Sequence, residues 1–188
     1  MKQKRLTLIA LGLVSFAQCF GAMGAAGVIG AGVARAAAAG SVVINEVAWA
    51  GSADSANDEW IELYNTSGVP VDLSGWTIND DQGQSVYNLA GVIAAHSYYL
   101  IEDSETVVQP NVANVVINVS LANSGDSLVL FDAGGQIIDA VNSSGGAWFA
   151  GNSTTHASME RIDALSSGDI VSNWVTSSSA GSTAVSSG

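Results

Sequence analysis

"SANDEWIELYN", residues Ser55 to Asn65, is the stretch that decides the fold. Within it Ile61 and Leu63 alternate with Glu62 and Tyr64. An apolar residue at every second position is typical of a β-strand, because successive side chains of an extended chain point to opposite faces. The stretch therefore predicts a strand that buries one face against a core.

The acidic residues of this stretch, Asp58, Glu59 and Glu62, allow two interpretations. In the first, the acids lie in a loop and on the solvated face of the strand. The second concerns Glu62, which stands between Trp60 and Tyr64. A carboxylate half covered by aromatic rings needs hydrogen-bond donors or a bound ion, because an unpaired buried charge is costly. The first interpretation predicts an architectural strand and the second a ligand or ion contact.

The rest of the chain has the same character. Short apolar runs rich in Val, Ile, Trp and Tyr are separated by Gly, Asn, Asp and Ser clusters, and no stretch has a helical period. About eight or nine strands at this spacing predict an all-β sandwich or barrel. "DDQGQ" (80–84) and "DAGGQ" (132–136) supply glycines for hairpin turns. The expected strands are 42–49, 59–64, 71–78, 85–89, 98–102, 112–119, 127–131, 137–141 and 173–176.

The amino-terminal residues have the pattern of an export signal. Basic MKQKR precedes an uncharged run that extends to Ala34, and small residues surround Arg35. We expect a signal peptide at 1–39, one domain at 40–177 and a flexible Ser/Gly-rich tail at 178–188, in a protein that is secreted or held at the cell surface. The alternative is an uncleaved membrane anchor, because the uncharged run exceeds the roughly 20 residues that span a bilayer.

Removal of the leader leaves a strongly acidic chain. All 17 acidic residues remain, against Arg161 as the one cation, and the single cysteine is lost. One cation cannot neutralise a row of phosphates, which excludes nucleic acid as a partner. Without cysteine there is no disulfide framework, so stability must come from the core. We expect no stable membrane span once the leader is removed.

"SGDSL" (124–128) contains the letters of a class of esterases. That chemistry needs Ser127 at a strand-to-helix turn beside a histidine base, whereas the residues that follow Ser127 continue a strand pattern. Neither His96 nor His156 has the expected spacing from an acid. The two lack the spacing of a zinc motif and a cysteine to complete one, so a zinc site would need both histidines and a carboxylate to meet in space. We therefore expect no enzyme, with a hydrolase that uses Ser127 as the minor alternative.

The loops suggest two further kinds of site. Calcium takes roughly six to eight oxygen ligands from flexible loops, and Asp54, Asp58, Asp80 and Asp81 are candidate ligands, with solvated loop charge as the alternative. Trp148, in the glycine-rich "SSGGAWFAGNS", is the aromatic residue expected to be exposed. It is the candidate for binding a partner such as a glycan, with a small-core role as the alternative.

Six short segments follow one another along the chain: "VVINEVAWAGS", "DEWIELYNTSG", "VDLSGWTIND", "LANSGDSLVLFD", "IIDAV" and "SMERI". Together they resemble a lamin tail domain of the type found in exported bacterial proteins, over about residues 42–175. The resemblance implies an immunoglobulin-like β-sandwich and a non-enzymatic module that contacts proteins or surfaces. It also implies architectural roles for Glu46, Trp60, Glu62, Asn65, Gly75, Trp76 and Arg161.

The chain departs from the lamin pattern in two respects. It has no heptad rod, so filament formation is not expected, and it lacks the basic residues that nucleic-acid contacts need. Arg161, the sole cation after cleavage, is expected to pair with Glu46 or Glu62. A different class of function is self-assembly into a homo-oligomer. In that case the segment 36–47, "AAAAGSVVINEV", adds as a strand to a neighbour's open sheet edge, with or without calcium.

Overall fold

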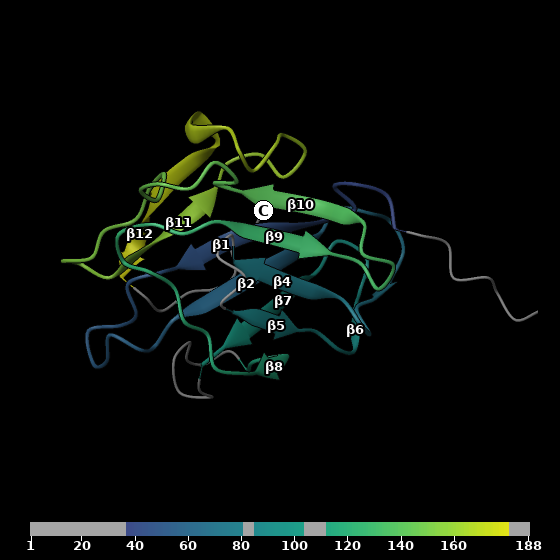
Figure 1. The fold of residues 1–188 in the computed structure, drawn as a ribbon, viewed down its shortest axis with the longest axis horizontal. Helices are drawn as coiled ribbons and strands as arrows, with labels where there is room; N and C mark the ends of the chain where they lie inside the picture. The colour runs from purple at the N-terminus through teal and green to yellow at the C-terminus, as the bar shows by residue number, and fades with distance from the viewer. Residues whose placement is uncertain (1–36, 81–84, 104–111, 181–188) are drawn as a thin grey trace, which may run out of the picture. The chain divides into compact units, whose positions relative to one another are not determined.

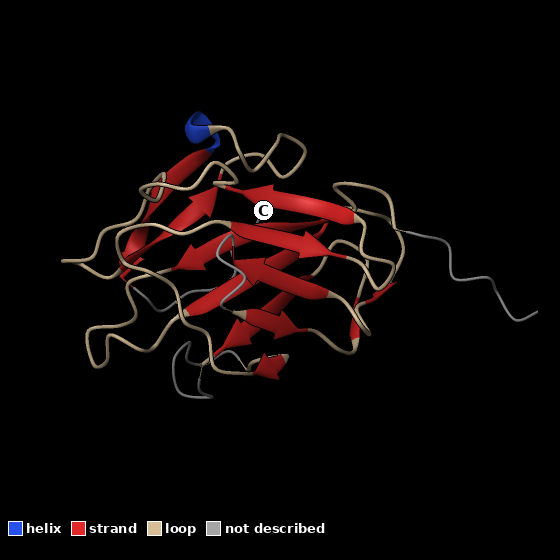
Figure 2. Ribbon diagram, viewed as in Figure 1, coloured by secondary structure: helices blue, strands red, loops and turns tan. Residues whose placement is uncertain are grey.

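The described part of the chain contains twelve strands and one turn of 3₁₀ helix, η1, at Val171–Asn173, joined by loops and turns. The computed structural model describes residues 37–80, 85–103 and 112–180. The strands form a six-stranded sheet, a four-stranded sheet and a small two-stranded sheet (Figures 1 and 2). Among these residues no helix has the length and apolar character needed to cross a bilayer.

The six-stranded sheet has the strand order β12-β11-β1-β2-β7-β8, and the four-stranded sheet has the order β10-β9-β4-β5. The four-stranded sheet crosses in front of the six-stranded sheet in Figure 1. Neighbouring strands are antiparallel except β7 and β8, which are parallel. The strands are β1 Val42–Ala48, β2 Trp60–Asn65, β3 Val71–Asp72, β4 Thr77–Asp80, β5 Val86–Asn88, β6 Val92–Ile93, β7 Tyr98–Glu102, β8 Val115–Val116, β9 Leu128–Phe131, β10 Ile137–Val141, β11 Ala157–Arg161 and β12 Trp174–Ala180.

Apolar residues that alternate along the strands fill the space between the two main sheets. Ile61 and Leu63 of β2 and Ile101 of β7 are fully buried, and they belong to the same cluster as Ile78 of β4 and Leu130 of β9. Two antiparallel layers with inner faces packed in this way form an immunoglobulin-like sandwich. The predicted all-β immunoglobulin-like fold is confirmed.

Most of the predicted strands form, but their bounds differ. A turn at Gly75, whose φ of +78° suits glycine, divides the predicted strand 71–78 into β3 and β4. The strands β6 and β11 were not predicted, and β12 runs to Ala180, beyond the expected domain boundary at 177. Both predicted hairpins pair, β4 with β5 and β9 with β10, although the turn 81–84 lies outside the described residues.

The segment proposed for strand addition is not at a sheet edge. Residues 42–48 form β1, which pairs with β2 on one side and with β11 on the other, and all of them are buried. The prediction that these residues add to a neighbour's sheet is therefore wrong, because their backbone donors and acceptors already pair within the sheet. Most of the predicted signal peptide, residues 1–39, lies outside the described residues, so export stays a prediction.

A β-bulge at Asn45 sets the side-chain pattern of β1. The register of β1 against β2 shifts between Ile44 and Glu46, which makes Asn45 an extra residue in the ladder. Because of this shift Ile44 and Val47, three positions apart, both belong to the core between the sheets. The same shift places Glu46 directly opposite Glu62 of β2.

Three glutamates lie in a row across the six-stranded sheet, and we call them the glutamate row. Glu46 is the cross-strand partner of both Glu62 and Glu160, so the three side chains share the outer face of the sheet. Glu46 and Glu62 are only 2% and 1% exposed. The Ser158 hydroxyl donates to Glu46 Oε1, and Asn45 Nδ2 donates to Glu62 Oε1 at 3.0 Å. The solvated-face interpretation of Glu62 is therefore wrong, and its covered carboxylate has the donor that the alternative required.

Burial alters the protonation of the glutamate row. Removal from water raises the pKa of Glu46 to about 8, partly offset by the hydrogen bond from Ser158. Removal from water likewise raises the pKa of Glu62 to about 7, partly offset by the hydrogen bond from Asn45. The negative charge of Glu160 raises the pKa of both, so the row favours bound protons in the folded state.

A buried arginine joins the two main sheets. A second register shift, between Ile137 and Asp139 of β10, turns the Asp139 carboxylate toward the core. There Arg161 of β11 donates from Nη1 to Asp139 Oδ2 at 2.7 Å and from Nη2 to Oδ1 at 3.3 Å. Arg161 also donates to the carbonyl oxygens of Ile44 at 3.0 Å and Ser166 at 2.5 Å. The guanidinium thus fixes both side-chain and main-chain groups around it.

The predicted pairing of Arg161 with Glu46 or Glu62 is wrong. Arg161 follows Glu160 in β11, and Glu160 shares the outer face of the sheet with the two other glutamates. Because successive side chains in a strand point to opposite faces, the Arg161 side chain points inward. Its guanidinium carbon lies 5.8 Å from the ring centroid of Trp174, which is also part of the core cluster.

Replacement of Arg161 by methionine would leave the Asp139 carboxylate buried without its cation. Removing one partner of a buried pair costs about 3–5 kcal/mol, and we expect Arg161→Met to lower the free energy of unfolding, measured by urea denaturation, by about that amount. The double variant Arg161→Met/Asp139→Leu should recover part of the loss. Glu62→Gln is the matched control. If it restored the stability of Arg161→Met while Asp139→Leu did not, the assigned pairing would be wrong.

The glutamate row makes the protein less stable as pH rises. Because folding raises the pKa values of Glu46 and Glu62 from 4.5, their contribution to stability is complete below about pH 4.5 and is lost as pH rises through about 7 to 8. Calorimetry at constant ionic strength should show Tm falling by about 5 °C or more between about pH 5 and about pH 8.

Two variants test the source of this pH dependence. Glu46→Gln keeps an acceptor for Ser158 but removes the titrating group, so the fall in Tm should become smaller. Asp54→Asn, at an exposed loop position, should leave the fall unchanged. A Tm that is constant or rises over this range in the unmodified protein would contradict the protonated state of the row.

Candidate functional site

Three loops meet at one end of the sandwich, at the left of Figure 1. The first follows β1 and begins at Trp49, the second precedes β9 and contains 121–127, and the third follows β10 and contains 142–152. Their ends are close because β1 and β10 finish, and β9 starts, at the same end of the two sheets. The fold therefore brings together segments about one hundred residues apart in the sequence.

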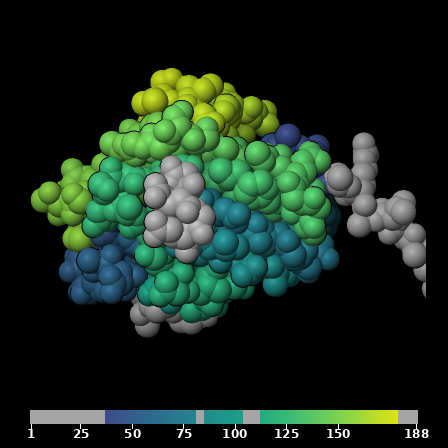
Figure 3. Space-filling model, in the orientation of Figure 1, coloured from purple at the N-terminus to yellow at the C-terminus, as the bar shows by residue number. Residues whose placement is uncertain are grey.

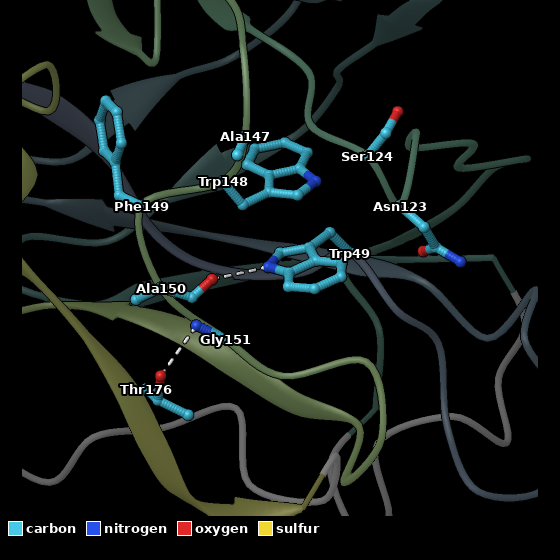
Figure 4. A pocket seen from close by; sticks show the side chains of 9 residues that line it. All are labelled: Trp49, Asn123, Ser124, Ala147, Trp148, Phe149, Ala150, Gly151 and Thr176. Atoms are coloured by element: carbon cyan, nitrogen blue, oxygen red, sulfur yellow. Dashed lines mark hydrogen bonds between the residues drawn. The ribbon is translucent and has the colours of Figure 1, made fainter.

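A pocket of about 400 Å³ lies between these loops and β12 (Figure 4). Trp49 and Trp148 form its aromatic walls, with ring planes inclined by only 10° and ring centroids 6.3 Å apart. The remaining residues are small or polar, apart from one phenylalanine. The pocket is lined by Trp49, Asn123, Ser124, Ala147, Trp148, Phe149, Ala150, Gly151 and Thr176.

Trp49 is held in place by the main chain of the third loop. Its Nε1 donates to the carbonyl oxygen of Ala150 at 2.9 Å, as Figure 4 shows. Gly151 packs directly against the indole, since a Cβ at this position would lie 2.5 Å from Nε1 of Trp49. The Gly151 N–H donates to Thr176 Oγ1 at 3.0 Å, which ties the loop to β12. Residue 151 must therefore be glycine, because any side chain there would occupy the space of the Trp49 indole.

Trp148 is held by the second loop. Its Nε1 donates to the carbonyl oxygen of Ala122 at 2.8 Å. The second and third loops approach so closely at Gly125 that a Cβ there would overlap the carbonyl oxygen of Gly146. Asn142 Nδ2 donates to the carbonyl oxygens of Asp126 at 2.7 Å and Gly146 at 3.1 Å, which fastens the two loops together.

Glu59 anchors the second loop to the six-stranded sheet. Its Oε2 accepts a hydrogen bond from the Leu121 N–H at 2.7 Å, and the residue is 6% exposed. Burial raises the pKa of Glu59 to about 7, against the opposing effect of that hydrogen bond, while the charges of Asp103 and Asp126 raise it further. The acid thus supports the pocket from behind and does not line it.

Trp148, predicted to be exposed, is half-buried: it lines the pocket and also packs against the core cluster, as the small-core alternative expected. Ligand binding by Trp148 stays a prediction. Of the predicted calcium ligands, Asp54 is exposed, Asp58 Oδ2 accepts from the Ser52 hydroxyl at 2.5 Å, and Asp80 Oδ2 accepts from the Ser85 N–H at 2.9 Å. Asp81 lies outside the described residues. Among the residues described, no three acidic, histidine or cysteine side chains gather to hold a metal ion. Calcium binding stays a prediction.

The residues of the hydrolase alternative do not meet. Ser127 is 1% exposed, and its Oγ has no hydrogen-bond partner within the described ranges. His156 Nδ1 contacts the carbonyl oxygen of Ala50 at 2.9 Å, and His96 is an exposed turn residue with a φ of +51°. Ser127 enters a strand, β9, and not a helix, so the expected nucleophile geometry is missing at this position.

The residues predicted to be architectural lie outside the pocket, within the body of the fold. Asn65 is fully buried, and its Nδ2 donates to the carbonyl oxygens of Val69 at 2.8 Å and Ala94 at 2.9 Å. Trp60 is buried on the outer face of the six-stranded sheet, and Trp76 is buried in the core cluster. Gly75 lies in the turn between β3 and β4, and the positions of Glu46, Glu62 and Arg161 are described above. None of the seven predicted architectural residues lines the pocket.

Sequence reasoning missed that Trp49 is the partner of Trp148. The one available signal is the similarity of "AWAG" at 48–51 to "AWFAG" at 147–151, in which each tryptophan precedes a glycine that opens a turn. Asn123 and Ser124 were not predicted as site residues. Their place in the pocket depends on the packing of the second loop against the third, which no local pattern records.

Fold and site together define an immunoglobulin-like β-sandwich with an aromatic pocket at its loop end. A model of the lamin tail domain matches residues 35–145, more than half of the chain, so the chain belongs to the lamin tail domain family. Lamin tail domains are non-catalytic immunoglobulin-like domains. No curated protein matches the chain. The match includes Trp49, but it ends before Trp148 and Arg161.

Proposed function

We propose that the protein is an exported, non-catalytic interaction module that contacts a partner at the cell surface through the pocket that Trp49 and Trp148 line. The observation that carries the proposal is that main-chain hydrogen bonds fix both indoles before any ligand arrives. A binding surface fixed in advance loses less entropy on association than one that must be ordered. Membership of the lamin tail domain family agrees with such a role.

The composition of the pocket favours binding over catalysis. None of its nine lining residues is an acid, a base or a cysteine. General acid–base chemistry needs a titrating group within reach of the reacting atoms, and nucleophilic chemistry needs a base beside the nucleophile. Ser124 and Thr176 are the hydroxyl residues of the lining, and no such base lines the pocket with them.

The location at the cell surface is supported by the first residues of the sequence. Basic MKQKR, an uncharged run and a small-residue segment around Arg35 have the order of a signal peptide. The strongly acidic remainder suits a protein that stays soluble outside the cell. The bacterial, exported type of lamin tail domain is therefore the form of the family that we propose for this chain.

Retention on the producing cells tests this function. The purified protein should remain on their envelope fraction through washing, and Trp148→Ala should lower the retained amount by about tenfold, because a buried aromatic anchor carries much of the energy of an interface. Tyr64→Ala is the matched control, since Tyr64 is also half-buried but lies on β2, outside the pocket. Equal retention of Trp148→Ala and Tyr64→Ala would contradict the proposal.

Self-association is a second candidate function, and the edge strand β12 favours it. The strand ends the six-stranded sheet and is seven residues long, and no residue from 170 to 188 is charged. Described residues near the C-terminal end, yellow in Figure 3, lie on the surface at the top of this view. Val171 and Val175 are 60% and 47% exposed. On a strongly acidic protein an uncharged edge is where two copies can approach without repulsion and pair their backbones.

Light scattering after size-exclusion chromatography tests the edge. We expect a concentration-dependent dimer that Val175→Lys abolishes, because a lysine on an edge strand opposes further pairing. Val92→Lys is the control, because Val92 is 60% exposed and belongs to the separate sheet of β3 and β6. Repeating both runs with calcium tests the calcium-assisted form. A monomer at every concentration, with and without calcium, would exclude self-association.

A further inference from the structure

The pocket presents flat aromatic faces and not aromatic donors. Both indole N–H groups are already used by carbonyl oxygens, those of Ala150 and Ala122. A ligand therefore meets the faces of the rings, and Trp148, which is half-buried, offers more of its surface than Trp49, which is 8% exposed. An aromatic face of this kind binds the apolar side of another ring through buried apolar surface and dispersion attraction, without directional hydrogen bonds.

Polar groups at the pocket supply the directional contacts. The Asn123 and Ser124 side chains are exposed, and neither has a hydrogen-bond partner within the described residues. A side-chain amide and a hydroxyl can each donate and accept. They match hydroxyl groups, which also do both, better than they match peptide carbonyls, which only accept. The ligand suited to this pair carries several hydroxyl groups.

Charge narrows the ligand further. No ionised side chain lines the pocket, so neither a cationic nor an anionic ligand finds a counter-charge there. The 17 acidic residues of the chain, with Arg161 as the one cation of its described part, repel anionic polymers in addition. A neutral ligand has no desolvated charge to compensate on entering an uncharged pocket.

We propose that the pocket binds a neutral saccharide, with one sugar ring stacked on Trp148 and its hydroxyl groups hydrogen-bonded to Asn123 and Ser124. This inference rests on the proposed function of the pocket as a contact site and names the chemistry of its ligand. The volume of about 400 Å³ accommodates a small ring system with its substituents. A proline-rich peptide is the rival ligand for an aromatic groove. Because both indole donors are taken, only the side chains of Asn123, Ser124 and Thr176 in the lining remain to donate to its carbonyls.

Calorimetric titration of the purified protein with neutral trisaccharides of glucose, mannose and N-acetylglucosamine tests the inference. At least one should bind, and Trp148→Ala should weaken binding about tenfold or more, whereas Tyr64→Ala should leave it unchanged. Trp148→Phe should retain part of the affinity, because it keeps an aromatic face. Gly151→Ala should lower the affinity as well, since its Cβ displaces Trp49. The circular dichroism spectrum of each variant confirms that it is folded.

The outcomes separate this inference from the proposed function. If Trp148→Ala abolishes envelope retention but no trisaccharide binds at about 10 mM, the saccharide assignment is wrong and the contact function stands. Binding of a proline-rich peptide at the pocket in place of sugars would also overturn it. If a trisaccharide binds through Trp148 and displaces the protein from the envelope, both are supported. Saccharide binding that Trp148→Ala and Asn123→Ala leave unchanged would place the sugar elsewhere and exclude the pocket.

Discussion

The ion pair between Arg161 and Asp139 is the constraint on which the sandwich depends. It lies inside the core, joins the six-stranded sheet to the four-stranded sheet, and exists only because a register shift in β10 turns Asp139 inward. A charged pair in such a place must keep all its partners, because either group alone would be a buried uncompensated charge. The carbonyl oxygens of Ile44 and Ser166 extend the same network into β1 and the loop after β11. The pair therefore fixes how the two layers sit on each other.

The acids on the other face of the six-stranded sheet follow a different logic. Arg161 is the one lysine or arginine in the described part of the chain, and it is already used in the core. Glu46 and Glu62 are thus buried without a cation beside them. Neutral hydrogen-bond donors and raised pKa values, which favour the protonated carboxyl groups, compensate for the missing cation. Like charges at cross-strand positions repel, so a proton retained on Glu46 or Glu62 lowers both the cost of burying the charge and the repulsion within the glutamate row. A strongly acidic chain can in this way carry carboxyl groups inside its fold.

Alternating residues such as Ile61 and Leu63 were sufficient to predict most of the strands and the sandwich, and glycine-containing turns were sufficient to predict the two hairpins. They were not sufficient to predict which face each acid occupies, because the bulge at Asn45 and the shift before Asp139 interrupt the period of two, and both depend on the partner strand. This is why the partner of Arg161 was wrongly expected. β11 was missed because Ser158 and Arg161, although polar by type, are buried with partners on distant strands. For the site, the loop tryptophan Trp148 was predictable, but its contact with Trp49 was not.

The construction of the pocket also bears on where its specificity comes from. Carbonyl oxygens and a glycine contact position the two indoles, so the aromatic walls depend on backbone geometry more than on the neighbouring side chains. Asn123 and Ser124 are exposed and hold nothing else in the described structure, so they can change without loss of the fold. Trp49, Asn123 and Ser124 fall within the residues that match the lamin tail domain, whereas Trp148 and Thr176 do not. Residues inside the matched range thus supply one wall of the pocket and residues beyond 145 supply the other, so the ligand binding that we propose depends on both.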